Sequence, residues 1–317
     1  GFYDLRLDET RIAQAKLAKE YGVDGFVYYH YWFHGKRLLE SPIEKLTQSD
    51  KPDFPFAICW ANETWTRAWD GQEREILIKQ TYSKDDHTEH TNYLANLFKD
   101  KRYIKISGKP LFIMYRPGKV EDLLDFTQKL RARAVEEGFP GVYLCGVKSS
   151  FGDELANCLD NDLFDAVIDF QPNSDDFPLG ENTYSKAADV AKKILPESIY
   201  QKIKTSTSGN KIISYSKLLN NKLTQSYDYH KRVLPCVFPS WDNSPRRKTA
   251  TIIQNDDPKL FSQWLEHAQD VVKRYPEPEQ IIMINAWNEW AEGCHLEPDT
   301  IMGTSFLTAL KDTFKEK

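Results

Sequence analysis

Short apolar runs alternate with helix-like segments along most of the chain. In the helix-like segments, apolar residues recur at three- and four-residue spacing, which is typical of helices that cover a sheet with one face. The clearest of them begin at Asp8, Lys84, Val120 and Pro258. Seven apolar runs have the length and the aromatic or β-branched content of strands covered on both faces: Gly25 to Trp32, Phe54 to Trp60, Pro110 to Tyr115, Val142 to Val147, Phe164 to Phe170, Leu234 to Phe238 and Gln280 to Ala286.

This alternation predicts an α/β fold with a parallel sheet. The 317 residues show no change of composition that would mark a second domain. We therefore expect residues 1–317 to form one catalytic (β/α)8 TIM-like barrel whose first strand is missing or lies upstream of Gly1. An open, doubly wound sheet is the alternative.

One connection is far longer than an ordinary loop between a strand and a helix. It covers about residues 172–231 and is rich in Pro, Ser, Asn and Lys. We interpret it as a long insertion or a lid over the active face.

The charge pattern argues against several classes of partner. The chain has 42 basic and 47 acidic residues mixed along the sequence, and its net charge is −5. Without a basic stripe, neither a nucleic acid nor an anionic membrane is an expected partner. No window approaches the roughly 18 uninterrupted apolar residues of a membrane span. Nothing in the sequence indicates an obligate protein partner.

The cysteines bear on the compartment. They are odd in number and have no close pair, so we interpret them as buried thiols in a reducing compartment, which favours a cytoplasmic bacterial protein. Because the chain begins at Gly1 without a methionine, a removed signal segment and a periplasmic location stay open. The five cysteines are Cys59, Cys145, Cys158, Cys236 and Cys294.

Two histidine pairs have the spacing of metal ligands. They are His30 with His34, and His87 with His90. Neither pair has a convincing third ligand, so we predict solvated or hydrogen-bonding roles for these side chains. The chain also has no glycine-rich phosphate loop. We therefore expect neither a metal nor a cofactor.

The densest set of chemical groups follows the last apolar run. In QIIMINAWNEWAEGCHLEPD, residues 280–299, the run leads into Asn288, Glu289 and Glu292. Parallel α/β enzymes keep their catalytic groups at the carboxyl ends of strands. Two carboxylates three residues apart at such an end can serve as an acid and a base. An N-cap cluster for a following helix is the alternative, because acidic residues favour helix starts.

The tryptophans suggest a sugar ligand. Seven of the eight lie at or just beyond predicted strand ends, and the one at Trp69 follows Trp60 and Trp65 in the same connection. Flat aromatic walls with polar groups between them suit a sugar ring. Core packing is the alternative for any single tryptophan. The residues that we expect to contact substrate are His30, Trp32, Trp60, Asn62, Glu63, Trp65, Tyr115, Arg116, Trp241, Asp242, Asn243, Arg246, Trp287, Asn288 and Trp290.

Four segments resemble a known family. They are CWANETWTRAWDG (59–71), GKPLFIMYRP (108–117), PCVFPSWDNSPRR (235–247) and INAWNEWAEGCHLEP (284–298). Together they are similar to the WbsX-like proteins of bacterial surface-polysaccharide gene clusters. Those proteins in turn resemble glycoside hydrolase family 99, the endo-acting α-mannosidases and mannanases. The resemblance covers nearly the whole chain and implies a (β/α)8 barrel.

The resemblance to family 99 implies that Glu289 and Glu292 are the catalytic pair. In that family the first glutamate is a base on the sugar's own 2-hydroxyl, which closes on the anomeric carbon with overall retention. The second protonates the leaving oxygen and then activates water. For that role Glu292 must hold a proton near neutral pH, which burial and the neighbouring Glu289 would favour. We further expect Glu63 to contact the reacting sugar, while Arg247 is either a sugar ligand or a solvated residue.

Three functions are consistent with this pattern. The first is a retaining, endo-acting glycoside hydrolase on an α-linked bacterial polysaccharide or oligosaccharide. The second is a glycosyltransferase of O-antigen or capsule (lipopolysaccharide) synthesis, which is how WbsX-like proteins are usually labelled. The third is a non-catalytic sugar-binding protein. Ala291 stands where the mannosidases are expected to have a histidine, so rhamnose or fucose is as consistent with the sequence as mannose.

Overall fold

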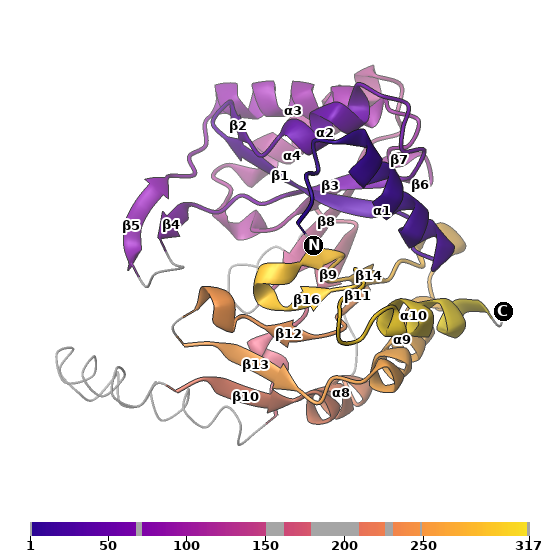
Figure 1. Cartoon of the computed structure of the whole chain (residues 1–317). Helices are drawn as coiled ribbons and strands as arrows, with labels where there is room; N and C mark the ends of the chain where they lie inside the picture. Colours follow the sequence, from indigo (N-terminus) through magenta and orange to yellow (C-terminus); the bar gives the residue numbers. More distant parts are fainter. Residues whose placement is uncertain are drawn as a thin grey trace.

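In a computed structural model of the chain, residues 2–67, 72–149, 162–178, 209–225, 231–247 and 249–315 are described. Seven parallel strands form one sheet and confirm the seven predicted runs, although the last strand is shorter than predicted (Figure 1). They are β1 (Phe26–Phe33), β3 (Phe56–Trp60), β7 (Lys109–Met114), β8 (Tyr143–Lys148), β9 (Ala166–Asp169), β11 (Arg232–Val237) and β14 (Met283–Ile284).

The order of these strands gives a TIM-barrel-like fold. Across the sheet they run β1-β3-β7-β8-β9-β11-β14, so each strand lies beside the next one in the sequence. A doubly wound sheet would reverse this order at a switch point, and that alternative is wrong. Among the described residues no backbone ladder joins β14 to β1, so the sheet is not a closed barrel. The rings of Phe26 and Trp287 lie 5.1 Å apart and connect the two sides by packing.

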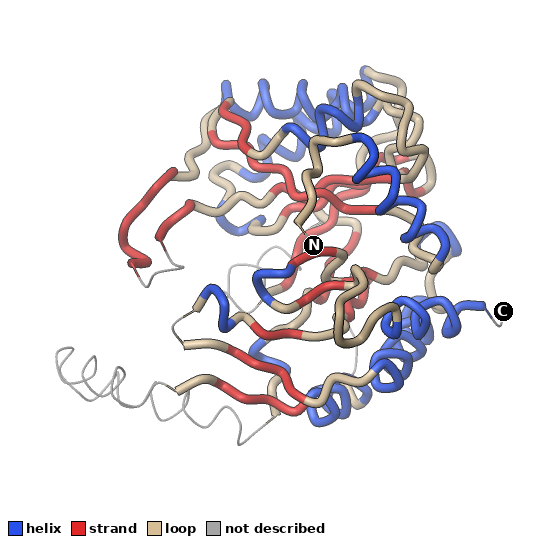
Figure 2. The backbone as a smooth tube through the Cα atoms, viewed as in Figure 1, coloured by secondary structure: helices blue, strands red, loops and turns tan. Residues whose placement is uncertain are grey.

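Helices cover the outer surface of the sheet (Figure 2). The predicted helices from Asp8, Lys84 and Pro258 are confirmed, and the one predicted from Val120 begins at Leu123. Side-chain caps start two of them: Ser83 accepts from the Asp86 N–H and Asp257 accepts from the Lys259 N–H. The helices are α1 (Asp8–Glu20), α2 (Ser41–Thr47), α3 (Lys84–Phe98), α4 (Leu123–Glu136), α8 (Tyr215–Leu223), α9 (Pro258–Val272) and α10 (Ser305–Lys315).

Two small sheets lie on the side where the parallel strands end (Figure 1). One is the antiparallel hairpin of β4 (Trp65–Arg67) and β5 (Gln72–Ile78). The other contains β10 (Lys211–Ser214), β13 (Thr251–Gln254) and β12 (Trp241–Asp242). Short strands β2 (Lys36–Leu38) and β6 (Lys105–Ile106) pair with β1 and β7.

The long connection predicted at 172–231 is only partly described. Within it, α8 packs against α9 and so belongs to the helical layer, with Leu218 and Leu219 in the same core cluster as Trp264 and Leu265. This described part of the connection is therefore packed into the fold. The segments 179–208 and 226–230, on which the lid interpretation depends, lie outside the described residues.

The described parts of the chain bear on three further predictions. No described helix is long and apolar enough to cross a membrane. The same residues contain no cluster of three or more His, Cys, Asp or Glu side chains that could hold a metal ion. Four cysteines are free and buried, whereas Cys158 lies outside the described residues; the four are Cys59, Cys145, Cys236 and Cys294.

A buried aromatic and histidine cluster fills the space between β1, β3 and α3. His30 and His90 face each other with their Nε2 atoms 3.0 Å apart, and the His90 ring stacks on Trp32. Trp60 packs edge-on against His90, and the Trp32 Nε1 donates to Asp86 Oδ1 at 2.7 Å. Burial lowers the pKa of His30 to about 3 and moves the pKa of His90 well below its usual range. Both histidines are therefore neutral in the folded protein.

Acidification is expected to destabilise the fold through His30 and His90. Below about pH 6.5 the unfolded chain binds protons on these residues that the folded chain does not. Their contribution to stability is fully present above that pH and is lost as the pH falls toward about 3, the folded pKa of His30. Each histidine accounts for about 1.4 kcal/mol per pH unit in this window. Urea unfolding at a series of pH values measures the slope.

Variants can assign this slope to the buried pair. His90→Gln keeps a polar partner for His30 and removes one titrating group. The dependence of the unfolding free energy on pH should therefore fall by about 1.4 kcal/mol per pH unit, the contribution of one proton. His34 is exposed, and His34→Asn is the control that should leave the slope unchanged. An equal slope in wild type and in His90→Gln would contradict the assignment.

Candidate active site

The inner face of the sheet carries aromatic side chains toward the carboxyl ends of the strands. Cross-strand register places Tyr29 beside Cys59, and Cys59 beside Ile113. The ring of Tyr29 lies 6.4 Å from that of Tyr31 and 6.0 Å from that of Tyr115. Tyr29 is 42% exposed, so part of its ring is accessible on this face. An accessible aromatic ring beside two others can contact a sugar.

Glu289 and Glu292 extend from the end of β14 on a small hairpin. Its strands are β15 (Asn288–Glu289) and β16 (Cys294–His295), joined through the 3₁₀ turn η7 (Trp290–Glu292). Glu289 precedes this turn without making a side-chain capping bond, and the next α-helix, α10, begins only at Ser305. The N-cap alternative is therefore wrong. The acids are presented on a hairpin at a strand end.

Arg246 lies between the two carboxylates. Its Nη1 is 3.6 Å from Glu289 Oε1 and 3.5 Å from Glu292 Oε1. The two oxygens are therefore within about 7 Å of each other. The carboxyl groups of inverting glycosidases stand about 6.5–9.5 Å apart, so most of that range is excluded for these atoms. Arg246 ends the 3₁₀ turn η5 (Ser244–Arg246), which packs against η7.

The two acids differ in environment. Burial raises the pKa of Glu292, Arg246 opposes the rise, Glu289 adds to it, and Arg247 opposes it. The side chain of Glu292 is 20% exposed and that of Glu289 is 37% exposed. A buried carboxyl group with a raised pKa retains its proton longer, as a general acid must.

Further groups extend the site along β1, β3 and β7. Burial, followed by the charge of Glu289, raises the pKa of Tyr31 to about 12, and Glu63 also contributes. Burial raises the pKa of Tyr115, and Glu63 and Glu292 add to that rise. Arg116 donates from Nε to Glu63 Oε1 at 2.8 Å. The structure thus brings Glu63, Arg116 and the two tyrosines to the neighbourhood of Glu289 and Glu292.

Trp290 is held at the edge of this site. Its ring stacks on His295 with centroids 3.7 Å apart, and its Nε1 donates to Glu297 Oε2 at 2.7 Å. The Tyr3 hydroxyl donates to the same oxygen at 2.8 Å, and Asn288 Nδ2 donates to that hydroxyl at 3.0 Å. Trp290 is nevertheless 45% exposed. A fixed indole with an accessible surface suits stacking on a sugar ring.

Three predicted contacts lie on the opposite side of the sheet from the acids. His30, Trp32 and Trp60 belong to the buried cluster that faces α3 and α4. Their side chains are at most 5% exposed. These three side chains therefore pack in the core and are not accessible to a sugar.

Other predicted contacts shape the backbone of the site. Asn62 is 1% exposed and accepts from the Arg116 N–H while donating to the Arg116 carbonyl, both at 2.8 Å, which ties the ends of β3 and β7 together. Asn243 Oδ1 accepts from the Thr251 N–H, and Asp242 Oδ1 accepts from the Ser244 N–H. These side chains therefore fix the backbone of the loops around the two acids.

The remaining tryptophans are partly buried. Trp65 packs edge-on against Tyr31 and Phe33. Trp241 packs against the core beneath α9, and Trp287 packs on Phe26. Trp69 lies outside the described residues.

Tyr29 and Tyr31 are site residues that the sequence analysis missed. The alternating pattern of β1 was the available signal, because residues that alternate along a strand share one face. The choice between the two faces could not be made from it, since both are aromatic.

Gly293 allows the acid-bearing hairpin to approach the loop of Arg246. Its φ is 56°, and a Cβ at this position would stand 3.0 Å from the Asp242 nitrogen and 3.1 Å from the Asp242 oxygen. The Ser240 hydroxyl also donates to the Gly293 carbonyl at 2.7 Å. Only a residue without a side chain fits this contact unstrained.

Gly293→Ala is expected to destabilise the hairpin and to reduce activity. The left-handed backbone alone costs an alanine about 1–2 kcal/mol, and the clash with the Asp242 backbone adds to that. Gly303→Ala is the matched control, because Gly303 has the same φ of 56° and no atom near its Cβ position. Urea unfolding and activity assays should both show a greater loss for Gly293→Ala. Equal losses would mean that contact with Asp242 is unimportant.

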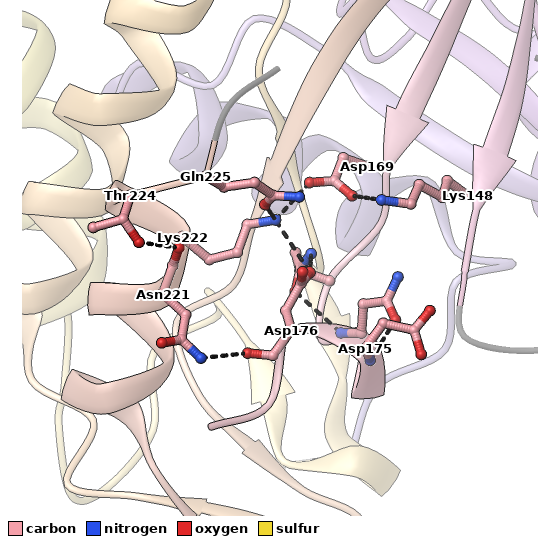
Figure 3. Close-up of polar contacts among 10 residues, drawn as sticks. Lys148, Asp169, Asp175, Asp176, Asn221, Lys222, Thr224 and Gln225 are labelled. Carbon is pink, nitrogen blue, oxygen red and sulfur yellow. Dashed lines mark hydrogen bonds and ion pairs between the residues drawn. The ribbon is translucent and has the colours of Figure 1, made fainter. Parts of the chain in front are cut away.

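A buried ionic network lies between α8 and the end of β9 (Figure 3). Lys222 on α8 is 1% exposed, and its Nζ donates to Asp169 Oδ2 at 2.6 Å and to Asp176 Oδ2 at 3.1 Å. Gln171 Nε2 also donates to Asp176 Oδ2, at 2.6 Å. The Gln171 carbonyl in turn accepts from Asn285 Nδ2 at 2.9 Å. The network therefore connects α8 and β9 to the segment that leads to Glu289.

A separate cavity of about 500 Å³ lies at the other end of the sheet. It is lined by Lys109, Arg131 and Asp165, which stand before or at the amino-terminal ends of β7 and β9 or on α4. In TIM-like folds this end serves stability, whereas catalysis occurs at the carboxyl ends. The acids on the β14 hairpin, at the carboxyl end, are therefore the candidate active site.

The family model of the WbsX glycosyltransferases matches residues 1–310. The chain belongs to the WbsX family. It is 33% identical over 314 residues to the uncharacterized protein WxcX from two strains of Xanthomonas campestris pv. campestris. The match covers 98% of this WbsX-family chain and 42% of WxcX, so the chain spans less than half the length of these relatives.

Two solved structures share the fold of this WbsX-family chain. A glycoside hydrolase-like protein superposes with a TM-score of 0.65 at 15% identity, over 100% of this chain and 88% of the other. The family 99 endo-α-mannosidase of Bacteroides thetaiotaomicron superposes with a TM-score of 0.56 at 13% identity, over 99% and 85% of the two chains. At these identities the likeness concerns the fold. It shows a TIM-barrel-like fold of the kind found in these glycosidases, while the family carries the name of a glycosyltransferase.

Proposed function

We propose that this chain is a retaining glycoside hydrolase that cleaves an α-linked bacterial polysaccharide or oligosaccharide. The observation that carries the proposal is the pair of Glu289 and Glu292 at a strand end, which lie 3.6 Å and 3.5 Å from the same Arg246 nitrogen and differ in burial. One ionised carboxylate and one protonated carboxyl group are the two partners that glycosidic cleavage needs.

Glu292 is the proposed general acid. Its proton goes to the glycosidic oxygen as the bond from that oxygen to the anomeric carbon breaks. Glu289 is the proposed base: it takes the proton of the sugar 2-hydroxyl while that oxygen closes on the anomeric carbon. Water, deprotonated by Glu292, then opens the resulting three-membered ring, and the proton on Glu289 returns to the 2-oxygen. Two displacements at one carbon give overall retention.

The surrounding residues would bind and orient the sugar. Tyr29, Tyr31 and Tyr115 provide a group of neighbouring aromatic rings, and Trp290 provides a further ring held by its contacts. Glu63, held by Arg116, would accept hydrogen bonds from sugar hydroxyls.

A glycosyltransferase is the second candidate, because the family carries that name. The two functions differ in the co-substrate. A hydrolase releases new reducing ends from a surface polysaccharide in buffer alone, whereas a transferase is active only with a nucleotide-sugar donor. We expect reducing ends without a donor. Activity that appears only after addition of a nucleotide sugar would establish the transferase instead.

A further inference from the structure

Arg246 is attracted by both catalytic carboxylates and bonded directly to neither. Its Nη1 distances of 3.6 Å and 3.5 Å exceed the usual 2.7–3.2 Å of a direct hydrogen bond. The side chain is 42% exposed and can be reached by a ligand in the site. Its guanidinium therefore has donor groups to offer to a substrate.

The position of Arg246 conflicts with the acid role of Glu292. A guanidinium favours the ionised carboxylate, and Arg247 acts in the same direction, whereas a general acid must keep its proton. The other described groups that interact electrostatically with Glu292 are Glu289, Tyr115 and Cys294. None of these is a cation, so the arginines are the groups whose effect must be offset.

Protonation of Glu292 leaves Arg246 with one charged partner of the pair. When Glu292 holds its proton, Glu289 is the carboxylate of the pair that stays ionised beside Arg246. A ligand with a single negative charge can then take the place of the second carboxylate, and a planar oxyanion can accept two parallel hydrogen bonds from a guanidinium.

We infer that Arg246 binds a singly charged oxyanion on the sugar substrate, such as a uronate carboxylate, and thereby selects acidic saccharides. The inference rests on the proposed function, because it names the substrate class of the same site. Engagement of Arg246 by the substrate withdraws it from Glu292. The acid then retains its proton to a higher pH when the correct sugar is bound, so recognition and proton transfer are coupled.

Calorimetric binding of simple glycosides tests the inference. We expect methyl glucuronoside to bind at least about tenfold more tightly than methyl glucoside, in keeping with a hydrogen bond to a charged group. Arg246→Gln should remove this preference, and Arg246→Lys should keep a part of it. Arg274→Gln, at the end of α9, is the control that should retain it fully. A 6-sulfated methyl glucoside distinguishes a general oxyanion site, which binds both anions, from a carboxylate-specific one.

The pKa of Glu292, followed by carboxyl ¹³C resonances, gives a second readout. Methyl glucuronoside should raise it in the wild type, and should raise it less in Arg246→Gln. Equal affinity for the charged and neutral glycosides, or a preference that persists in Arg246→Gln, would overturn the inference. If Glu292→Gln still abolishes hydrolysis of a neutral polysaccharide, the proposed function stands without it. If Glu292→Gln has no effect on turnover, the proposed function itself is wrong.

Discussion

Glu292→Gln is expected to lower kcat on a bacterial surface polysaccharide by about 10²–10⁴-fold, the usual contribution of a general acid. Glutamine has nearly the same shape as glutamate but cannot give a proton to the leaving oxygen. Binding of the polysaccharide should be unchanged, since the sugar-contacting groups remain in place. Reducing-end release measures kcat, and calorimetry measures binding.

The pH profile separates a chemical role of Glu292 from a structural one. Because the acid form is required, wild-type activity should fall as the pH rises through the elevated pKa of Glu292, and Glu292→Gln should lack this limb. An activated aryl glycoside needs little protonation of its leaving group. Glu292→Gln should therefore slow cleavage of such a substrate less than cleavage of the polysaccharide. Glu266→Gln, on the exposed face of α9, is the control. Full turnover by Glu292→Gln would sink the assignment.

Lys222→Met is expected to lower the free energy of unfolding by about 3–5 kcal/mol, the typical cost of breaking a buried ion pair. Asp169, which is 2% exposed, and Asp176 would lose their shared cation. Activity should fall as well, because Asp176 holds Gln171, whose carbonyl anchors Asn285. Urea unfolding at neutral pH measures the stability, and reducing-end release measures the activity.

Two further variants identify the cause of the loss. Asn220→Met changes the exposed face of the same helix and should alter stability little. Asp169→Asn in the Lys222→Met background removes one of the two buried charges that lost Lys222 and should recover part of the stability. If the double variant is as unstable as Lys222→Met alone, the cost arises from packing of the lysine stem.

The strand β1 shows what an apolar pattern can and cannot predict. Its sequence, FVYYHYWF, predicted a strand correctly, but both of its faces are aromatic. A shift of one residue exchanges the two faces, and a strand covered on both sides lacks the alternation of polar and apolar residues that would fix the choice. His30 and Trp32 were expected at the sugar, whereas the structure turns them toward α3 and turns Tyr29 and Tyr31 inward.

The sequence by itself determined the seven parallel strands, the four predicted helices, and the position of Glu289 and Glu292 beyond a strand end. These follow from local periodicity, which neighbouring residues are enough to define. Only the tertiary structure decided that Arg246 meets both acids, that Glu292 is the more buried of the two, and that Gly293 admits the loop of Asp242. Such contacts join segments more than 40 residues apart along the chain. They depend on where the folded sheet places its strand ends, which no local pattern encodes.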